Sequence, residues 1–165
     1  MNGSTTSRTE SKTSKITSSE IKKPLKQVAL KSYKNLLIGN NSYIFLTKEK
    51  HHLAELMRYP LICLSPNSGT RNFYNNFYLQ NQLTLCPTTE VATSNQLLPI
   101  IKAGLGIGFV PEILIKDDLA KQTVVEIPLY EKIPSREIFL LENTTRHLSV
   151  AATTLKQMLL QKYLL

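Results

Sequence analysis

Residues 100–112 read IIKAGLGIGFVPE, in which an apolar helical segment runs into three alternating glycines and then into a short apolar strand that stops at a proline. Glycine alone takes a positive φ without steric cost, and it lets another backbone or a ligand approach closely. The stretch therefore predicts a helix end, a tight turn and a buried strand, with glycines that let the helix and the strand pack closely. It is not a dinucleotide-binding fingerprint, because GxGxxG requires a glycine at the position of Phe109 and places its glycines at the start of a helix.

The composition is that of a soluble globular protein, with 165 residues of which 42% are hydrophobic and 19% charged. Such a chain holds one domain with a real core, or part of a larger bilobal one. No apolar run approaches the roughly 20 residues that span a bilayer, and residues 1–20 lack the apolar segment of a signal peptide. We therefore expect a cytoplasmic protein without membrane contact. Cys63 and Cys86 lie in apolar surroundings without C-x-x-C spacing, which predicts two buried free thiols.

The positive charge is concentrated at the start of the chain. Residues 1–50 carry a net charge of +7, and residues 51–165 only +1. The basic part has few aromatic side chains to stack on bases and no helix-turn-helix pattern, so the charge does not indicate a nucleic-acid surface. Residues 2–23 are dominated by Ser, Thr and Lys, and so little apolar surface cannot offset the entropy of ordering. We expect residues 1–24 to be a poorly ordered segment.

Apolar patterning from residue 25 onward alternates between strands and helices. We expect strands at residues 27–30, 35–38, 59–64, 90–93, 108–110, 124–127 and 138–141, with residues 43–46 extending the second strand or forming another. Helices are expected at residues 51–57, 70–80, 94–103 and 112–116. Phe73, Phe77 and Tyr78 fall on one face of the second, Ser94 is the expected N-cap of the third, and Ser149 caps a further, amphipathic helix. Pro99 is awkward in the third of these, because it removes a hydrogen bond and delays or bends the helix. The alternation predicts an α/β fold with a mixed sheet.

The loop Ser65–Arg71 joins the end of a predicted buried strand to the start of a predicted helix. Such a loop aims backbone N–H groups and small hydroxyls at the crevice beyond the carboxyl end of the strand. Ser68 and Thr70 can each donate a hydrogen bond to a ligand carboxylate there. The alternative interpretation is that Ser68 or Gly69 only caps the helix. Ser94 repeats the arrangement as a hydroxyl residue between a strand and a helix, and two such loops are better evidence for a site than one.

The histidines indicate neither a metal site nor a catalytic base. His51 and His52 are adjacent, so their side chains diverge, and no cysteine or third histidine lies at ligand spacing; surface histidines are the simpler interpretation. His147 has no nucleophile elbow and no acid partner at a known spacing. We therefore predict no metal, no cofactor and no enzymatic activity.

The chain resembles the effector-binding domain of LysR-type transcriptional regulators. The resemblance is carried by five segments in this order and spacing: PLICL at 60–64, NSGTR at 67–71, EVATS at 90–94, AGLGIGFVPE at 103–112 and IPSREI at 133–138. Each segment alone is weak, but the ordered set with its glycines is fairly specific. The resemblance extends over residues 25–165.

The resemblance implies a periplasmic-binding-protein-like (type 2) bilobal α/β fold with a small-molecule cleft between the lobes. By this comparison residues 45–124 form a complete second lobe, residues 25–43 and 126–130 contribute the crossover segments, and residues 137–165 return to a partial first lobe. Closure of the two lobes shifts an oligomer between DNA-binding arrangements, an equilibrium that a ligand biases only by differential affinity.

The resemblance also implies which residues bind the effector. In that family the loop matching Asn67, Ser68, Gly69 and Thr70 and the helix start matching Ser94 line the cleft. Small organic anions are frequent effectors, which suits hydroxyls and N–H groups at helix ends. These five residues are the predicted effector-binding site.

The chain departs from the family pattern at its start. The family's helix-turn-helix and the opening of its first lobe are absent from this sequence, which therefore looks like a truncated gene product or a fragment. We expect that it contacts DNA only through a helix-turn-helix domain absent from this chain, so that a gel shift with the purified chain shows no operator binding. The leading hypothesis is an effector-sensing domain that works in a homo-oligomer or with a full-length relative. The alternative is a stand-alone small-ligand-binding or dimerisation module.

Overall fold

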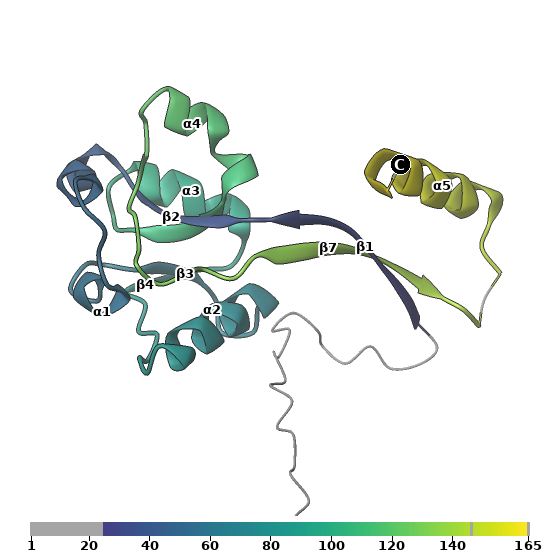
Figure 1. Cartoon of the computed structure of the whole chain (residues 1–165), viewed down its shortest axis with the longest axis horizontal. Helices are drawn as coiled ribbons and strands as arrows, with labels where there is room; N and C mark the ends of the chain where they lie inside the picture. Colours follow the sequence, from purple (N-terminus) through teal and green to yellow (C-terminus); the bar gives the residue numbers. More distant parts are fainter. Residues whose placement is uncertain (1–24, 146, 165) are drawn as a thin grey trace, which may run out of the picture.

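The computed structural model describes residues 25–145 and 147–164; the poor order expected for residues 1–24 concerns a segment outside the described residues. An α/β body occupies one side of the molecule, and a long two-stranded ribbon leads from it to a helix at the other side (Figure 1). The predicted α/β class with a mixed sheet is confirmed.

Short strands build the sheet of the body: β2 (Asn35–Gly39), β3 (Ile62–Leu64), β4 (Thr89–Val91), β5 (Gly108–Pro111) and β6 (Val125–Glu126). β2 lies between β5 and β6 and is antiparallel to both, while β3 and β4 are parallel neighbours. A parallel bridge between Leu61 and Ile107 joins the two groups, and the N–H of Ile62 donates to the Ile107 carbonyl at 2.9 Å. Strand β2, which we expected among the crossover segments, is thus paired on both sides within the body.

Both faces of this sheet are buried. Successive side chains of a strand point to opposite faces, so Leu37 and Cys63 contribute to one hydrophobic core, and Ile38 and Ile62 to the other. A sheet covered on both faces needs apolar residues at consecutive strand positions, which is the continuous pattern that the sequence shows in these strands.

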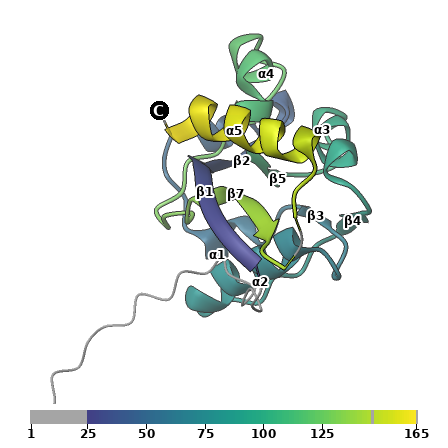
Figure 2. The ribbon, with the colours of Figure 1, turned by 90° about the vertical axis from the view of Figure 1, so that its right-hand side faces the viewer.

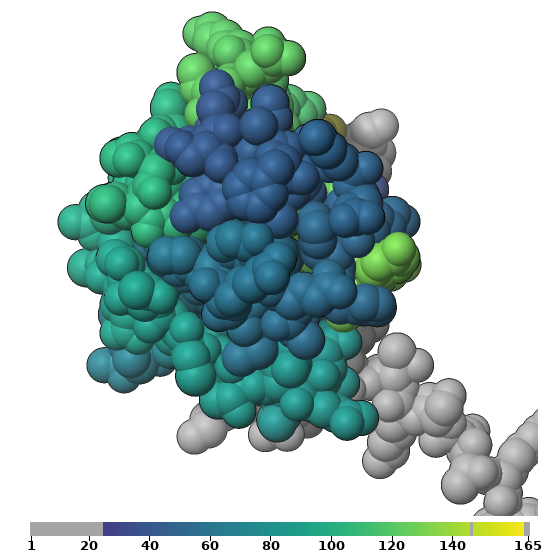
Figure 3. Space-filling view, turned by 90° about the vertical axis from the view of Figure 1, so that its left-hand side faces the viewer, coloured from purple at the N-terminus to yellow at the C-terminus, as the bar shows by residue number. Residues whose placement is uncertain are grey.

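Helices cover the two faces. The first core holds α1 (Leu53–Leu56), α2 (Gly69–Gln80) and the 3-10 helix η1 (Asn41–Thr47); the second holds α3 (Ser94–Lys102) and borders η2 (Glu112–Leu114) and α4 (Lys116–Ala120). Seen from the end opposite the ribbon, η1 and the segment with α1 cover the body, and α4 projects at one edge (Figure 3). The aromatic face predicted for α2 is confirmed, because Phe73, Phe77 and Tyr78 are all buried.

The glycine segment folds as its pattern predicts. After α3, Gly104 takes a φ of +83°, a conformation that glycine adopts without steric cost. Its N–H donates to the Ile101 carbonyl at 2.9 Å, and the N–H of Leu105 donates to the Ile100 carbonyl at 3.4 Å. This pair of bonds is a Schellman motif, which satisfies carbonyls that the helix end leaves free.

The next two glycines permit close backbone packing. A Cβ at Gly106 would clash with the backbone carbonyl of Pro60, which accepts a hydrogen bond from the N–H of Ile107 at 2.9 Å. A Cβ at Gly108 would lie 2.8 Å from Cδ1 of Ile101 on α3. The expectation that these glycines let the helix and the strand pack closely is confirmed.

Two expectations about the body are wrong. Residues 43–46 form part of η1 rather than a strand, because the Asn40 side chain accepts from the N–H of Ser42 at 3.1 Å and starts a helical turn. The N-cap of α3 is Thr93 rather than Ser94, and its N–H donates to the Gln96 side chain at 3.1 Å. Pro99 does not delay this helix, which begins at Ser94 and runs past the proline to Lys102.

The ribbon consists of β1 (Leu25–Tyr33) and β7 (Arg136–Asn143), which are antiparallel. Its register runs from the pair Leu25 and Asn143 at the far end to the pair Tyr33 and Arg136 at the body. β1 continues almost directly into β2, so one nearly continuous extended segment connects the ribbon to the centre of the body's sheet. The ribbon is therefore anchored at its root.

Helix α5 (Val150–Leu164) lies along the ribbon, with contacts to β1 (Figure 2). The Ser149 hydroxyl accepts from the N–H of Ala152 at 3.2 Å, which confirms the predicted cap. The helix is not amphipathic as expected, because its apolar residues are spread around its axis. Apolar side chains remain exposed on it and on the ribbon; these are Leu25, Ile138, Leu141, Val150, Leu155, Met158 and Tyr163. No helix among the described residues is long and apolar enough to cross a membrane.

Candidate functional site: a cavity at the root of the ribbon

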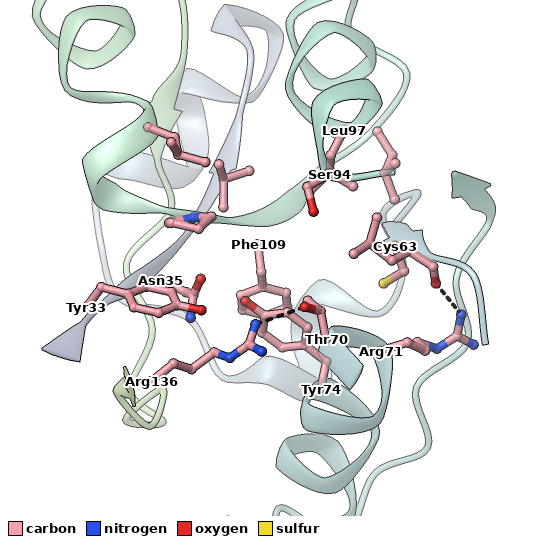
Figure 4. A pocket seen from close by; sticks show the side chains of 15 residues that line it. Tyr33, Asn35, Cys63, Thr70, Arg71, Tyr74, Ser94, Leu97, Phe109 and Arg136 are labelled. Carbon is pink, nitrogen blue, oxygen red and sulfur yellow. Dashed lines mark hydrogen bonds between the residues drawn. The ribbon is translucent and has the colours of Figure 1, made fainter. Parts of the chain in front are cut away.

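A cavity of about 680 Å³, which includes the solvent at its mouth, lies where the ribbon joins the body (Figure 4). The body contributes the starts of α2 and α3 together with β3 and β5, while the ribbon contributes the end of β1 and the start of β7. Its lining residues are Tyr33, Asn35, Ile62, Cys63, Leu64, Thr70, Arg71, Tyr74, Ser94, Leu97, Phe109, Val110, Pro111, Leu114 and Arg136.

Arg136 crosses from the ribbon to the body. Its Nη1 donates a hydrogen bond to Oγ1 of Thr70 at 2.9 Å, as the dashed line in Figure 4 shows. The centre of its guanidinium group lies 5.0 Å from the ring centroid of Phe73 and 5.8 Å from that of Tyr33. A cation between aromatic faces is held electrostatically, so the guanidinium is fixed at the wall of the cavity.

Arg71 is buried, and its charge is compensated within the body. Its Nη1 donates to Oε1 of Glu90 at 2.6 Å and to the Leu64 carbonyl at 3.1 Å, while its Nε donates to Oδ1 of Asn75 at 3.1 Å. These bonds tie the end of β3 to β4 and to α2. Arg71 therefore supports the loop that leads into α2 and brings little free charge to the cavity.

Three buried polar atoms of lining residues have no hydrogen-bond partner among the residues that the structure describes: Nδ2 of Asn35, Oη of Tyr74 and Nε of Arg136. Asn35 and Tyr74 are each only 4% exposed. A buried polar group without a partner costs about 1–3 kcal/mol, and acceptors on a bound molecule would offset that cost at these three atoms.

Tyr74 is protonated and can act as a donor. Burial raises its pKa, and the nearby Arg136 guanidinium offsets this only in part. Its ring stacks on that of Phe109, with centroids 4.5 Å apart and planes at 21°. This contact fixes the direction of the hydroxyl.

The structure brings two of the five predicted site residues to the cavity. Thr70, in the first turn of α2, and Ser94, at the start of α3, both line it. Ser68 caps α2, because its Oγ accepts from the N–H of Arg71 at 3.0 Å, which is the alternative considered for it. Asn67 precedes the cap and Gly69 is the first residue of α2, and neither is among the lining residues. Ligand contact by any of the five stays a prediction.

Sequence reasoning did not single out four polar residues of the cavity, namely Tyr33, Asn35, Tyr74 and Arg136. The sequence contains one indication that Asn35 has a special role, because it is a polar residue at the start of an otherwise apolar strand. Arg136 lies 66 positions from Thr70, and nothing local in the sequence indicates that they meet.

Cys63 is a lining residue with an unreactive thiol. Burial raises its pKa to about 11, against a lowering by Arg71, so the thiol is neutral at physiological pH. The prediction of two buried free cysteines is right for Cys63 and wrong for Cys86, which is exposed.

The histidines lie away from the cavity lining. The prediction of a surface pair is wrong for His51, whose side chain is only 12% exposed and whose Nε2 lies 3.1 Å from the Leu46 carbonyl oxygen. His52 is exposed, and its Nδ1 lies 3.1 Å from Oε1 of Glu131. Within residues 25–145 and 147–164, no group of three or more His, Cys, Asp or Glu side chains is placed to hold a metal ion.

The arrangement is that of a type 2 periplasmic-binding-protein-like fold, with the cavity at the junction of the body and its connecting strands. The family model of the LysR substrate binding domain matches residues 24–163. The chain belongs to this family, whose members are the effector-binding domains of LysR-type transcriptional regulators. No curated protein sequence matches the chain.

Solved structures share the fold at low sequence identity. The effector-binding domain of QuiR in complex with shikimate has a TM-score of 0.73 and 17% identity, over 87% of this chain and 68% of its own length. The regulatory domain of CcmR from Synechocystis PCC6803 in complex with 2-PG has a TM-score of 0.74 and 16% identity, over 84% and 67%. Full-length HypT from Salmonella typhimurium has a TM-score of 0.66 and 20% identity, over 84% and 47%. The chain thus spans about two thirds of the isolated domains and about half of the full-length regulator.

Proposed function

We propose that this chain is the effector-sensing part of a LysR-type regulator and that its effector binds in the cavity at the root of the ribbon. The observation that carries the proposal is that the cavity is shared between the body and the ribbon: Thr70 and Ser94 come from the body, and Arg136 from the ribbon. A ligand that contacts both parts changes the free energy of their relative arrangement. A regulator needs this differential affinity in order to respond to a small molecule.

The proposed ligand is a small organic anion, and Thr70 and Ser94 are its proposed hydroxyl contacts. The unpartnered donors and the N-terminal ends of α2 and α3 at the cavity favour an acceptor with negative charge. QuiR and CcmR are solved with shikimate and 2-PG respectively, which is consistent with a small-molecule site in this fold.

We further propose that the site binds and does not catalyse. Cys63 is held neutral by its raised pKa, and none of the three histidines is among the residues that line the cavity. We propose that the protein acts in the cytoplasm, in an oligomer or with a full-length relative, where a helix-turn-helix domain of the regulator contacts DNA.

A thermal-shift screen of the purified chain with small carboxylates at millimolar concentration tests the binding function. A ligand present at 100 times its Kd stabilises the native state by about 2.7 kcal/mol, which raises the Tm of a chain of this size by several degrees. The absence of any Tm increase across charged and neutral compounds of this size would contradict the proposal.

A second candidate function is an interaction module, and the exposed apolar residues of the ribbon and α5 favour it. Val150, Leu155 and Met158 are 85%, 58% and 62% exposed, and large apolar side chains gathered in this way are typical of interaction surfaces. Light scattering of the purified chain tests this candidate, with a mass above 18.7 kDa as the supporting result and a monomer at all concentrations as the contrary one.

A further inference from the structure

We propose that the cavity recognises a small organic monocarboxylate, with Arg136 binding the carboxylate and Asn35 and Tyr74 as the neighbouring donors. The inference rests on the proposed function, since it assigns the ligand chemistry and the specificity-determining residues of the same cavity. The three residues come from β7, β2 and α2, and the sequence singled out none of them as a ligand contact.

The three buried polar atoms without a partner among the described residues define which hydrogen-bonding groups the ligand must carry. Nε of Arg136 and Nδ2 of Asn35 can only donate hydrogen bonds, and the Tyr74 hydroxyl is protonated. All three line one cavity, and Figure 4 shows the side chains of Asn35, Tyr74 and Arg136 on the same side of it. A carboxylate is acceptor-only and has two oxygens with about four lone-pair sites, so one such group can satisfy several converging donors.

The charge of the cavity selects a monoanion. Arg71 and Arg136 both line it, but Arg71 forms a salt bridge with Glu90 at 2.6 Å. Arg136 forms no salt bridge with any residue that the structure describes. One positive charge is therefore uncompensated, and a monocarboxylate neutralises it, whereas a dianion leaves a negative charge in a partly apolar cavity.

Arg136 is oriented before a ligand arrives. The rings of Phe73 and Tyr33 flank its guanidinium group, and Nη1 is bound to Thr70. Nε has no partner among the described residues, and the planar donor fork of arginine matches a carboxylate. A fixed donor group loses little conformational entropy on binding, which favours affinity.

The other residues that line the cavity indicate the chemistry of the rest of the ligand. Leu97 on α3, Val110 on β5 and Leu114 after it present apolar side chains to the cavity. Such a surface fits an apolar ring or chain attached to the carboxylate. The Ser94 hydroxyl is the one further polar contact that α3 contributes among the lining residues, and it can bind a substituent oxygen.

Isothermal titration calorimetry and thermal shift with matched probes test this assignment. The probes are benzoate and cyclohexanecarboxylate, their neutral amides, and phenyl phosphate as a dianion. The variant is Arg136→Gln, and Arg58→Gln, an exposed arginine that is not among the lining residues, is the control for net charge. Because a charge-assisted hydrogen bond is lost, we expect carboxylate affinity to fall about 10- to 100-fold in Arg136→Gln and to change less than twofold in Arg58→Gln.

The outcomes separate this inference from the proposed function. Equal affinity of acids and amides, preference for phenyl phosphate, or unchanged carboxylate binding in Arg136→Gln would each overturn the inference and leave a small-molecule site in place. Binding of no probe, charged or neutral, would count against both. If Arg136→Gln does not fold, Tyr74→Phe replaces it: this variant keeps the ring stacked on Phe109, and we expect three- to tenfold weaker carboxylate binding, with unchanged binding as the contrary result.

Discussion

Arg136 on the ribbon and Thr70 on helix α2 are joined by a hydrogen bond of 2.9 Å, although 66 positions separate them in the sequence. Arg136 is also paired across the ribbon with Tyr33, the last residue of β1. The bond therefore connects the root of the ribbon to the start of a helix in the body. Any ligand that binds Arg136 acts on the link between the two parts of the molecule.

Replacing Thr70 by Val removes the acceptor of this bond and keeps the shape of the side chain. We expect the free energy of unfolding to fall by about 1.5–3 kcal/mol, the range for hydrogen bonds to charged groups. Urea denaturation measures the change, and Thr84→Val, at an exposed threonine, provides a matched control that we expect within 0.5 kcal/mol of wild type. Equal stability of the two variants would show that the bond does not hold the ribbon to the body.

Gly106 and Gly69 differ in what a methyl group would meet. In Gly106→Ala the Cβ clashes with the Pro60 carbonyl, so the backbone must move; we expect a loss of about 2–4 kcal/mol. In Gly69→Ala the Cβ meets nothing within 4 Å at the first position of α2, and we expect no loss or a gain of about 0.4–1 kcal/mol. Thermal denaturation of the pair measures this difference, and similar stabilities would contradict the close packing assigned to the glycine segment.

Local patterns in the sequence predict most of the body. The apolar runs predict β2, β3 and β5, and the alternating glycines predict the turn after α3. These features can be predicted because each of them depends on residues that are close in the chain. The failures have local causes too: the Asn40 side chain turns residues 43–46 into a 3-10 helix, which apolar content alone does not reveal.

Only part of the candidate site can be predicted from the sequence. Thr70 and Ser94 follow strand ends and were predicted because that position is typical of ligand loops. Arg136 and Asn35 reach the cavity through the antiparallel pairing of the ribbon and the central place of β2, which are long-range features. The salt bridge between Arg71 and Glu90, which leaves Arg136 as the arginine with an uncompensated charge, is equally non-local.

The two cysteines differ in reactivity, and pH changes this difference in a predictable direction. Cys86 is exposed, whereas Cys63 is buried with a pKa of about 11. We expect an alkylating reagent at pH 7 to label one thiol per native chain quickly, and Cys86→Ser to abolish that fast phase. Labelling of Cys63 accelerates as pH rises toward 11, because the thiolate fraction grows. Two fast thiols in the native chain at pH 7 would contradict the burial of Cys63.

The raised pKa of Cys63 also affects stability. The thiol ionises more readily in the unfolded chain, near pH 9, than in the folded one. Its contribution to stability is complete below about pH 9 and is lost as pH rises toward 11.

Removing the carboxylate of Glu90 leaves the buried guanidinium of Arg71 without its charged partner. We expect Glu90→Ala to lose about 2–3 kcal/mol, less than for a fully buried pair because the Glu90 side chain is 41% exposed and water can approach. Glu49→Ala, at an exposed position with no salt bridge among the described residues, is the control, with an expected change within 0.5 kcal/mol. A Glu90→Ala chain as stable as the control would show that the pair does not support the cavity wall.

A crystal structure of the chain with the monocarboxylate that raises its Tm most shows directly where the effector binds and which residues hold its carboxylate. We expect the ligand in the cavity at the root of the ribbon, with its carboxylate within hydrogen-bond distance of Nε of Arg136 and Oη of Tyr74 and its apolar part against Leu97 and Val110. A carboxylate directed to solvent, or a ligand bound elsewhere on the body while the cavity holds only water, would contradict it.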